Sequence, residues 1–417
     1  MWIGLCVVVV AAGCSIQHHP FRPEADAAVD APTVNFRALA YLKDPTPAAN
    51  DNFGYSVAMS GDADILAVGA IQGSAAGYVD VFQRRGEGWS FWQRLSTGDA
   101  SFGCSLALSD NGYTLVVGAL GAANNAGAAY VFTNNTASWT NHGALPVPSP
   151  ASFDGIGHSV AVNADGSKIV VGARGDSSNA GAAHVFMRLG AVPNWAHSAK
   201  LLPEAPSAFG ESVAISHDGS TIAVGTAAGV TYAFVDGVQA PVISAGGNRV
   251  ALSGDGTTLA TASRTYGGFG AAFIYTRDAA GWLQRETISA SNPYIPPGPT
   301  GIFAFGSSLA LSANGSVLAV GAFGESSNAT GVNGDQLDHS AKNAGAAYVF
   351  RRSGDTSAQT DYVKATNTDA FDGFAGYSLA LDATGAMLLV GAPYESSNGD
   401  PTNNDASGAG AAYLYGP

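Results

Sequence analysis

The sequence predicts an all-β fold, a seven-bladed β-propeller made of four-stranded blades. Three observations lead to this prediction. A short motif recurs seven times along the chain, its two halves keep a constant separation, and each copy is followed by two further strand patterns. Repeats of four short strands are typical of small sheets arranged radially around a channel.

The first half of the motif reads Phe-Gly-x-Ser, followed by an aliphatic residue and Ala. Its six clear copies begin at Phe53, Phe102, Ile156, Phe209, Phe305 and Ala375, and an eroded copy runs from Asn248 to Ala251. The second half, Val-Gly-Ala or a close variant, is centred on Gly69, Gly118, Gly172, Gly225, Ala262, Gly321 and Gly391. The Ser, or Arg249 in the eroded copy, precedes this centre by 13 positions in every copy. This constancy predicts a β-hairpin of fixed length, with turns such as Asp110-Asn111-Gly112.

A third and a fourth strand follow each hairpin. The third ends in an aromatic pair, as in Tyr130-Val131-Phe132. The fourth has an aromatic residue six positions before an aliphatic one, as in Trp89 and Leu95, with weaker versions around Val242 and Val363. Because six is an even spacing, both side chains are expected on one face of the strand.

The last repeat ends on its third strand, Tyr413-Leu414-Tyr415. Its missing fourth strand is expected at the other end of the propeller, because Phe36 and Leu42 have the same spacing as Trp89 and Leu95. The sequence therefore predicts that residues 36–43 complete blade seven and close the ring, leaving no exposed sheet edge there.

The Phe-Gly…Val-Gly-Ala pattern resembles the FG-GAP repeats of integrin α-subunit propellers and of many bacterial surface proteins. The resemblance covers nearly all of residues 34–417. In integrins it implies Ca²⁺ sites in the turn between strands one and two, but turns such as Ser253-Gly254-Asp255-Gly256 are too short to wrap an ion. Those Ca²⁺ sites are therefore not expected here.

The N-terminus predicts export. An apolar run from Ile3 to Ala12 is too short to span a bilayer and ends in Ala11-Ala12-Gly13-Cys14, which resembles a bacterial lipoprotein signal. The resemblance implies a signal peptide at 1–13, a lipid on Cys14 and, because Ser15 rather than Asp follows, outer-membrane sorting with the domain either periplasmic or surface-exposed. An ordinary signal peptide is the alternative. Residues 14–33 show no strand periodicity and are expected to form a flexible tether.

Composition narrows the function classes. The net charge of −14 argues against binding nucleic acid, which requires a basic surface. The eight His residues are scattered, and no nucleophile motif precedes a helix. His158 and His184 replace Tyr or Cys of other repeats and are interpreted as packing variants, Cys104 as a buried inert thiol, and Arg174-Gly175-Asp176 as repeat consensus rather than an adhesive tripeptide.

The connection between strands two and three varies in length and is longest in blades six and seven. Long loops are often functional, and these two carry clustered oxygen donors. The ligand-binding candidates are Glu325, Asn328, Asp335, Asp338, Glu395, Asn398, Asp400 and Asp405. No cofactor is required, although Ca²⁺ could be held in the long loops; the identity of any metal stays open.

These observations predict a non-enzymatic, monomeric binding scaffold of the cell envelope. Its partner is expected to be a protein or glycan on the face with the long loops, and its membrane contact to be the lipid anchor alone. Two alternatives stay open: an enzyme that uses carboxylates or a metal in the long loops, and a purely structural envelope protein.

Overall fold

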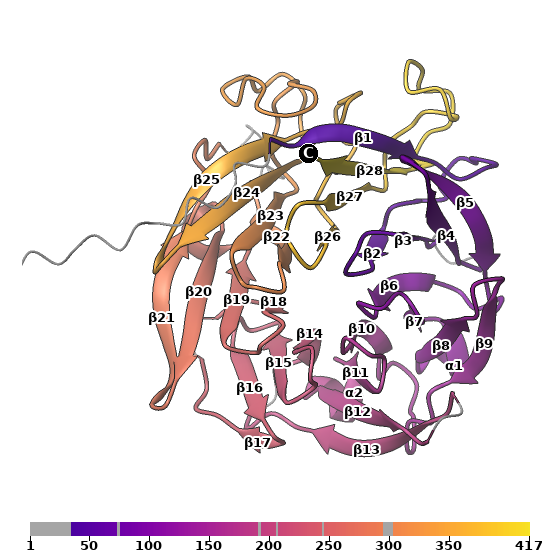
Figure 1. The fold of residues 1–417 in the computed structure, drawn as a ribbon, viewed down its shortest axis with the longest axis vertical. Coiled ribbons are helices and arrows are strands. Elements are labelled where there is room, and N and C mark those ends of the chain that lie inside the picture. Colours follow the sequence, from indigo (N-terminus) through magenta and orange to yellow (C-terminus); the bar gives the residue numbers. More distant parts are fainter. Residues whose placement is uncertain (1–34, 73–75, 191–192, 206, 244–245, 295–302) are drawn as a thin grey trace, which may run out of the picture. The chain divides into compact units, whose positions relative to one another are not determined.

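The computed structural model describes residues 35–72, 76–190, 193–205, 207–243, 246–294 and 303–417, which belong to one compact unit, Val34–Pro417. The predicted signal peptide, Cys14 and most of the tether lie outside the described residues. Seven four-stranded antiparallel sheets form a ring around a central channel (Figure 1), so the predicted propeller is confirmed. Within the described part, no helix is long and apolar enough to cross a membrane.

Each blade runs outward from its first strand. Blades one to four contain β2 (Ser56–Met59), β3 (Ile65–Ala70), β4 (Tyr78–Arg85) and β5 (Gly88–Leu95); β6 (Phe102–Leu108), β7 (Thr114–Ala119), β8 (Ala128–Asn134) and β9 (Trp139–Ala144); β10 (Ile156–Val162), β11 (Lys168–Ala173), β12 (Ala182–Arg188) and β13 (Trp195–Leu201); and β14 (Phe209–Ile215), β15 (Thr221–Thr226), β16 (Thr231–Val235) and β17 (Val238–Gln239). Blades five to seven contain β18 (Arg249–Leu252), β19 (Thr258–Ser263), β20 (Ala271–Asp278) and β21 (Gly281–Ile288); β22 (Phe305–Leu311), β23 (Val317–Ala322), β24 (Ala346–Ser353) and β25 (Thr356–Val363); and β26 (Leu379–Leu381), β27 (Leu388–Ala392), β28 (Ala411–Gly416) and β1 (Arg37–Leu42). Short helical turns α1 (Ala122–Asn125), α2 (Asp176–Asn179) and η1 (Tyr266–Gly268) lie between second and third strands.

The constant spacing of the motif corresponds to a cross-strand pair. In blades one to six, the motif Ser or Arg249 lies opposite the residue 13 positions later, as Ser105 lies opposite Gly118. The hydroxyl of Ser105 donates a hydrogen bond to the carbonyl oxygen of Gly157 in the next blade, at 2.7 Å. A Cβ on Gly118 would lie 2.1 Å from that same oxygen, so the Ser–Gly pair lets neighbouring blades approach closely.

The turns between first and second strands form a second ring. Seven backbone hydrogen bonds join each turn to the next: Gly61 N to Asp110 O, Asn111 N to Ala164 O, Ala164 N to His217 O, His217 N to Gly254 O, Gly254 N to Ala313 O, Ala313 N to Ala383 O, and Ala383 N to Gly61 O. A turn of different length would break this circle, which explains why the first hairpin has the same length in every blade.

The N-terminal strand completes blade seven, as predicted. Strand β1 pairs antiparallel with β28, with Arg37 opposite Gly416 and Leu42 opposite Ala412. Phe36 and Leu42 are 5% and 4% exposed, and they pack in the clusters on the two sides of blade seven. The ends of the propeller are therefore joined by a strand ladder.

The prediction that Trp89 and Leu95 share one strand face is wrong. The register between β4 and β5 shifts by one residue between Val81 and Phe82, which marks a β-bulge. Because one extra residue reverses the alternation of side chains, Trp89 packs against the cluster shared with blade seven and Leu95 against the cluster shared with blade two. The spacing of six thus packs one side chain against each neighbouring blade, with Trp89 partly buried and Leu95 buried.

Two details of register also differ from the sequence pattern. In blade seven, Phe374 rather than Ala375 is the buried motif aromatic, and Ala375 takes the glycine position with a φ of 58°. Gly376 is therefore an added residue. In blade four the fourth strand is reduced to β17, and the expected segment near Val242 contributes only a bridge between Ile243 and Thr231.

Candidate functional site

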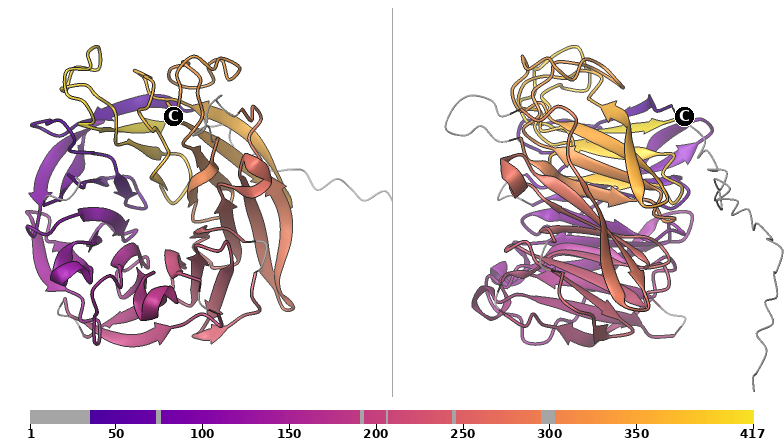
Figure 2. Two further views of the ribbon diagram at one scale, coloured as in Figure 1. Left: turned by 180° about the vertical axis from the view of Figure 1, so that it is seen from behind. Right: turned by 90° about the vertical axis from the view of Figure 1, so that its left-hand side faces the viewer.

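The loops between second and third strands lie together on one face of the ring. Figure 2 shows this face from behind the view of Figure 1 and from the side, with the long loops of blades six and seven rising next to each other. The sequence predicted this face as the binding face from the lengths of these loops and their oxygen donors. Residues that directly precede the motif Ser, such as Tyr55 and Glu211, also line the mouth of the central channel here.

Two of the eight candidate residues are buried anchors of these loops. Glu325 and Glu395 are each 1% exposed. Glu325 pairs with Lys364 at 2.7 Å, and Glu395 pairs with Lys43 at 2.5 Å. Each ion pair joins the start of a long loop to the end of the fourth strand of its own blade, so these carboxylates hold the loops in place.

The other six candidates lie near the loop surface: Asn328, Asp335, Asp338, Asn398, Asp400 and Asp405. Of these, Asp338 is partly buried and the other five are exposed. Most of their hydrogen bonds stay within their own loop, as between Asp335 and the amide of Leu337 or Asp400 and the amide of Thr402. Among the described residues, no hydrogen bond or ion pair joins the blade-six candidates to those of blade seven, and no group of three or more His, Cys, Asp or Glu side chains is placed to hold a metal ion.

Sequence reasoning missed two exposed aromatic residues on the same face. Phe153 and Phe371 are 76% and 57% exposed and have φ angles of 70° and 72°. Both lie just before an Asp whose carboxylate accepts a hydrogen bond from the amide three residues earlier, and Asn50 has this position in blade one. The repeat did contain a signal for these residues, because Phe stands where blade one has Asn, a residue type that tolerates a positive φ.

Phe153 lines a groove between blades two and three. The groove has a volume of about 570 Å³ and also contacts Leu120, Asn125 and Arg174. It therefore offers an apolar wall beside a positive charge.

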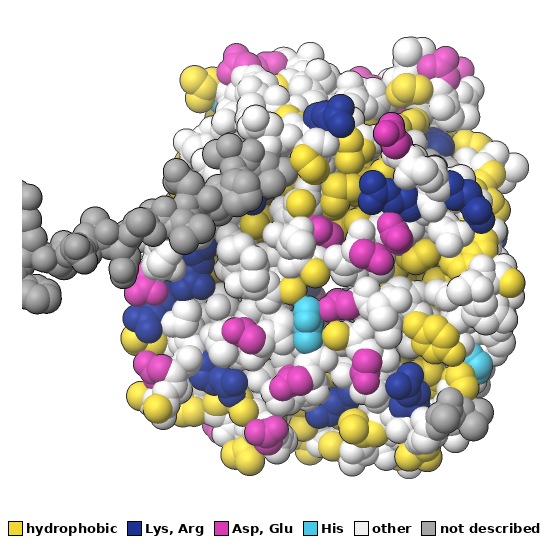
Figure 3. Space-filling model, in the orientation of Figure 1, with side chains coloured by type: hydrophobic (Ala, Val, Ile, Leu, Met, Phe, Trp, Pro, Cys, Tyr) yellow, Lys and Arg dark blue, Asp and Glu magenta, His cyan; other side chains and the backbone are white. Residues whose placement is uncertain are grey.

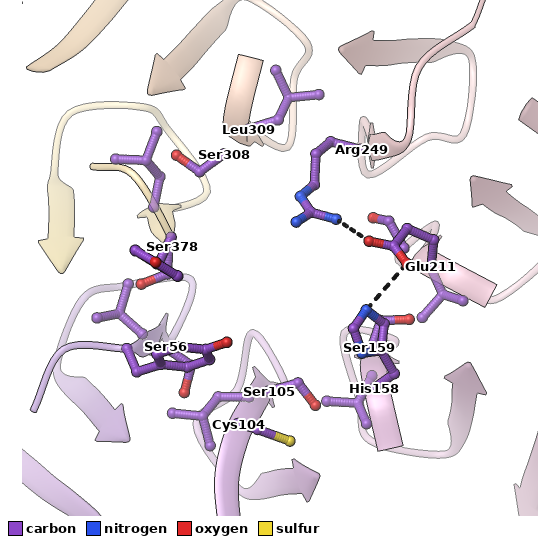
Figure 4. Close-up of a pocket in the computed structure, with 18 of the residues that line it drawn as sticks. Ser56, Cys104, Ser105, His158, Ser159, Glu211, Arg249, Ser308, Leu309 and Ser378 are labelled. Atoms are coloured by element: carbon purple, nitrogen blue, oxygen red, sulfur yellow. Dashed lines mark hydrogen bonds and ion pairs between the residues drawn. The ribbon is translucent and has the colours of Figure 1, made fainter. Parts of the chain in front are cut away.

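The channel mouth holds a network of charges centred on Glu211 (Figure 4). Its Oε1 accepts a hydrogen bond from Nη1 of Arg249 at 3.2 Å, and its Oε2 lies 3.1 Å from Nη1 of Arg174 and 3.4 Å from Nε2 of His158. Burial alone would raise the pKa of Glu211, but the hydrogen bond from His158 and the charges of His158 and Arg249 lower it to about 2. Glu211 is thus ionised and fully engaged with cations.

The mouth opens into a cup of about 280 Å³ inside the channel. Ser56, Ser105, Ser159, Ser212, Ser308 and Ser378 line it, with Arg249 at the seventh position of this layer. Below them, aliphatic residues such as Val57, Leu106 and Val160 form the floor. Tyr55 and Tyr377 also line the cup, with ring centroids 5.0 Å apart.

The opposite face of the ring is acidic around the channel, in contrast to the arginines at the cup mouth. Figure 3 shows that face, where acidic side chains surround the centre of the ring. Acidic residues occupy most of the turns between first and second strands: Asp62, Asp110, Asp165, Asp218, Asp255 and Asp382. His217 bridges the channel end by pairing with Asp110 at 2.9 Å. The arginines at the cup mouth are therefore a property of the long-loop face.

Comparison with known families agrees with this architecture. The family model for the FG-GAP repeat matches residues 40–82 and 89–132, which span most of blade one and most of blade two. The remaining blades share the same motif and strand order. The chain contains FG-GAP repeats within a seven-bladed β-propeller. No curated protein matches it significantly.

Among solved structures, the FG-GAP propeller is similar to the crystal structure of Sqt1 from Chaetomium thermophilum, with a TM-score of 0.52 and 15% identity. The match covers 87% of this chain and 83% of the other. At this identity the likeness concerns the fold alone.

Three residues that the sequence singled out have defined surroundings in the FG-GAP propeller. Burial raises the pKa of the Cys104 thiol to about 11, so the reactive thiolate is scarce near neutral pH. His158, interpreted from sequence as a packing variant, belongs to the Glu211 network. Asp176 of the Arg-Gly-Asp sequence is buried against Lys200 at 2.8 Å, so this tripeptide is not displayed.

Proposed function

We propose that this FG-GAP propeller is a non-enzymatic interaction scaffold that binds a protein partner on its long-loop face. The fold supports a protein-interaction scaffold. The observation that carries the proposal is the pair Phe153 and Phe371. Each is a large apolar side chain that faces solvent in a left-handed backbone conformation, which costs an L-residue about 1–2 kcal/mol relative to right-handed geometry. Neither burial nor backbone preference explains Phe at these positions, whereas a partner that covers the rings would.

The surroundings define the chemistry of that partner. The ring of Phe371 lies near Lys342, and Phe153 borders the groove with Arg174. Acidic side chains of the long loops, including Asp335, Asp400 and Asp405, are exposed on the same face. A complementary partner would insert apolar side chains at the two Phe positions and place basic residues against the loops, where opposite charges speed association.

The cellular setting forms part of the same proposal. The sequence Ala11-Ala12-Gly13-Cys14 supports a lipid on Cys14, which would tether a monomeric propeller to the outer membrane through residues 14–33. A Cys14→Ser variant should lose the lipid mass and its membrane fractionation. A variant with unchanged mass and fractionation would contradict the anchor.

The binding face is tested by replacing both exposed rings with the residue found at Asn50. The Phe153→Asn/Phe371→Asn double variant should keep its melting temperature, because Asn tolerates a positive φ. Affinity purification from the envelope of the native host, followed by mass spectrometry, should recover a partner with wild type and lose it with the double variant. The control is Phe91→Asn, since Phe91 is exposed on the outer strand β5. Equal recovery with all three proteins would overturn the proposal.

A further inference from the structure

Arg249 is the exception in the serine layer of the cup. The other six blades place Ser at this position, and wherever this Ser forms the cross-strand pair its partner is Gly. Blade five instead pairs Arg249 with Ala262. The sequence pattern suggested simple erosion of the repeat. The structure gives the change a consequence, because the guanidinium group projects into the channel and binds Glu211 (Figure 4).

Positive charge prevails around this mouth. Arg174 and Arg249 both contact Glu211, and Arg264 follows β19 at the position that Arg174 has after β11. Two arginines and His158 therefore contact a single carboxylate, in a chain whose net charge is −14. Glu211 already has three cationic or potentially cationic partners, so the site does not call for a further cation.

Arg249 keeps hydrogen-bond donors available to a ligand in the cup. Arg249 uses Nε for the carbonyl oxygen of Ser307 and Nη1 for Glu211, and among the described residues no protein atom accepts a hydrogen bond from its Nη2. Nδ1 of His158 is buried and likewise has no partner within the described part of the chain. A buried polar atom such as Nδ1 of His158 normally has a hydrogen-bond partner in proteins, which points to a missing partner in the cup.

We propose that the cup binds a small carboxylate-bearing ligand, with the carboxylate on Arg249 and the body of the ligand against Tyr55 and Tyr377. A guanidinium group held by a fixed carboxylate presents its remaining N–H groups in the planar geometry that carboxylates accept. The volume of about 280 Å³ suits a molecule of the size of one sugar ring or one amino acid. Glu211 acts as the positioning residue that orients Arg249 and Arg174.

The inference extends the proposed function but does not depend on it. The cup and the two exposed Phe residues lie on the same face, so the carboxylate could belong to a free acid or to the chain terminus of a bound protein. The Phe153→Asn/Phe371→Asn variant keeps the cup intact. Loss of partner binding and loss of carboxylate binding can therefore be separated.

The test compares ligands that differ only in the carboxylate, by isothermal titration calorimetry in low-salt buffer. Glucuronate is paired with glucose, and a tripeptide with a free C-terminus is paired with its C-terminal amide. Wild type should bind at least one acid more than 10-fold tighter than its neutral counterpart. Binding of glucuronate alone identifies a free acid, and binding of the tripeptide alone identifies a chain terminus.

Variants complete the test. Arg249→Gln should weaken acid binding by at least 10-fold. The double variant Arg249→Ser/Ala262→Gly should have the same effect. Because it restores the Ser–Gly pair of the other blades, it is expected to fold, so that misfolding would not explain a loss of binding. Arg277→Gln, on the outer hairpin β20–β21, should leave the affinity unchanged. Absence of acid binding by wild type, or equal affinity in the Arg249 variants, would overturn the proposal.

Discussion

The hydroxyl of Ser105 and the carbonyl oxygen of Gly157 lie 2.7 Å apart across the boundary between blades two and three. Equivalent bonds join Ser56 to Gly103, Ser159 to Gly210 and Ser378 to Gly54. The most regular polar position of the repeat is thus an interblade contact, and the Gly opposite each Ser provides the space for it.

Replacement of Gly118 by Ala tests this contact. The new Cβ would lie 2.1 Å from Gly157 O and 2.3 Å from Ser105 Oγ, so we expect a loss of at least ~2 kcal/mol in the free energy of unfolding. Ala262→Gly, at the same position of blade five, should change it by less than ~1 kcal/mol. Urea unfolding measures both. Equal effects of the two substitutions would contradict the role assigned to the Ser–Gly pair.

Deletion of residues 34–43 tests closure of the ring. It removes the buried side chains of Phe36 and Leu42 and exposes the edge of β28, so we expect a loss of at least ~3 kcal/mol in the free energy of unfolding. Deletion of residues 1–33 alone is the control and should have no effect. A shortened protein with the melting temperature of the control would show that closure by β1 is dispensable.

His184 should make the propeller sensitive to acid. It is 1% exposed and lies 3.1 Å from His197, and burial together with the charges of His197 and Lys200 lowers its pKa to about 4, against the opposing effect of Asp176. Because this pKa is below the value near 6.5 in the unfolded chain, the folded state binds fewer protons between these pH values. Stability should therefore fall as the pH drops from about 6.5 to about 4, by up to ~3 kcal/mol.

The matched variant is His184→Tyr, since Tyr130, Tyr348 and Tyr413 have this position in other blades. Melting temperatures measured between pH 4 and pH 8 should show a smaller acid loss in this variant than in wild type. Identical pH profiles would mean that His184 does not control the transition.

The architecture was largely predictable from the sequence because the same contacts recur in the blades and therefore require the same residue types at the same spacing. Motif spacing identified the hairpin, and the spacing of Phe36 and Leu42 identified the closing strand. The one-face prediction for Trp89 and Leu95 failed because a bulge is invisible to even–odd counting. Ala375 was assigned to the aromatic position of the motif because the sequence still contains Gly and Ser after the one-residue insertion.

The candidate site was less predictable because it depends on contacts between distant residues. Glu325 and Glu395 looked like ligand donors, yet Lys364 and Lys43 reach them from fourth strands that lie far away in sequence. Arg249 looked like erosion because its contact with Glu211 crosses a blade boundary. Phe153 and Phe371 were overlooked because their difference from Asn50 in the repeat gains its meaning from the positive backbone φ, which the sequence does not show.

The central claim, that a protein partner covers the long-loop face, is tested most directly by site-specific photocrosslinking in the cells that naturally express the chain. The photoreactive residue p-benzoylphenylalanine replaces Phe153, Phe371 or, as the control on the outer strand, Phe91. Positions 153 and 371 should each give a crosslink to the same protein, and position 91 should give none. A partner captured only at position 91, or no crosslink at positions 153 and 371, would contradict the account.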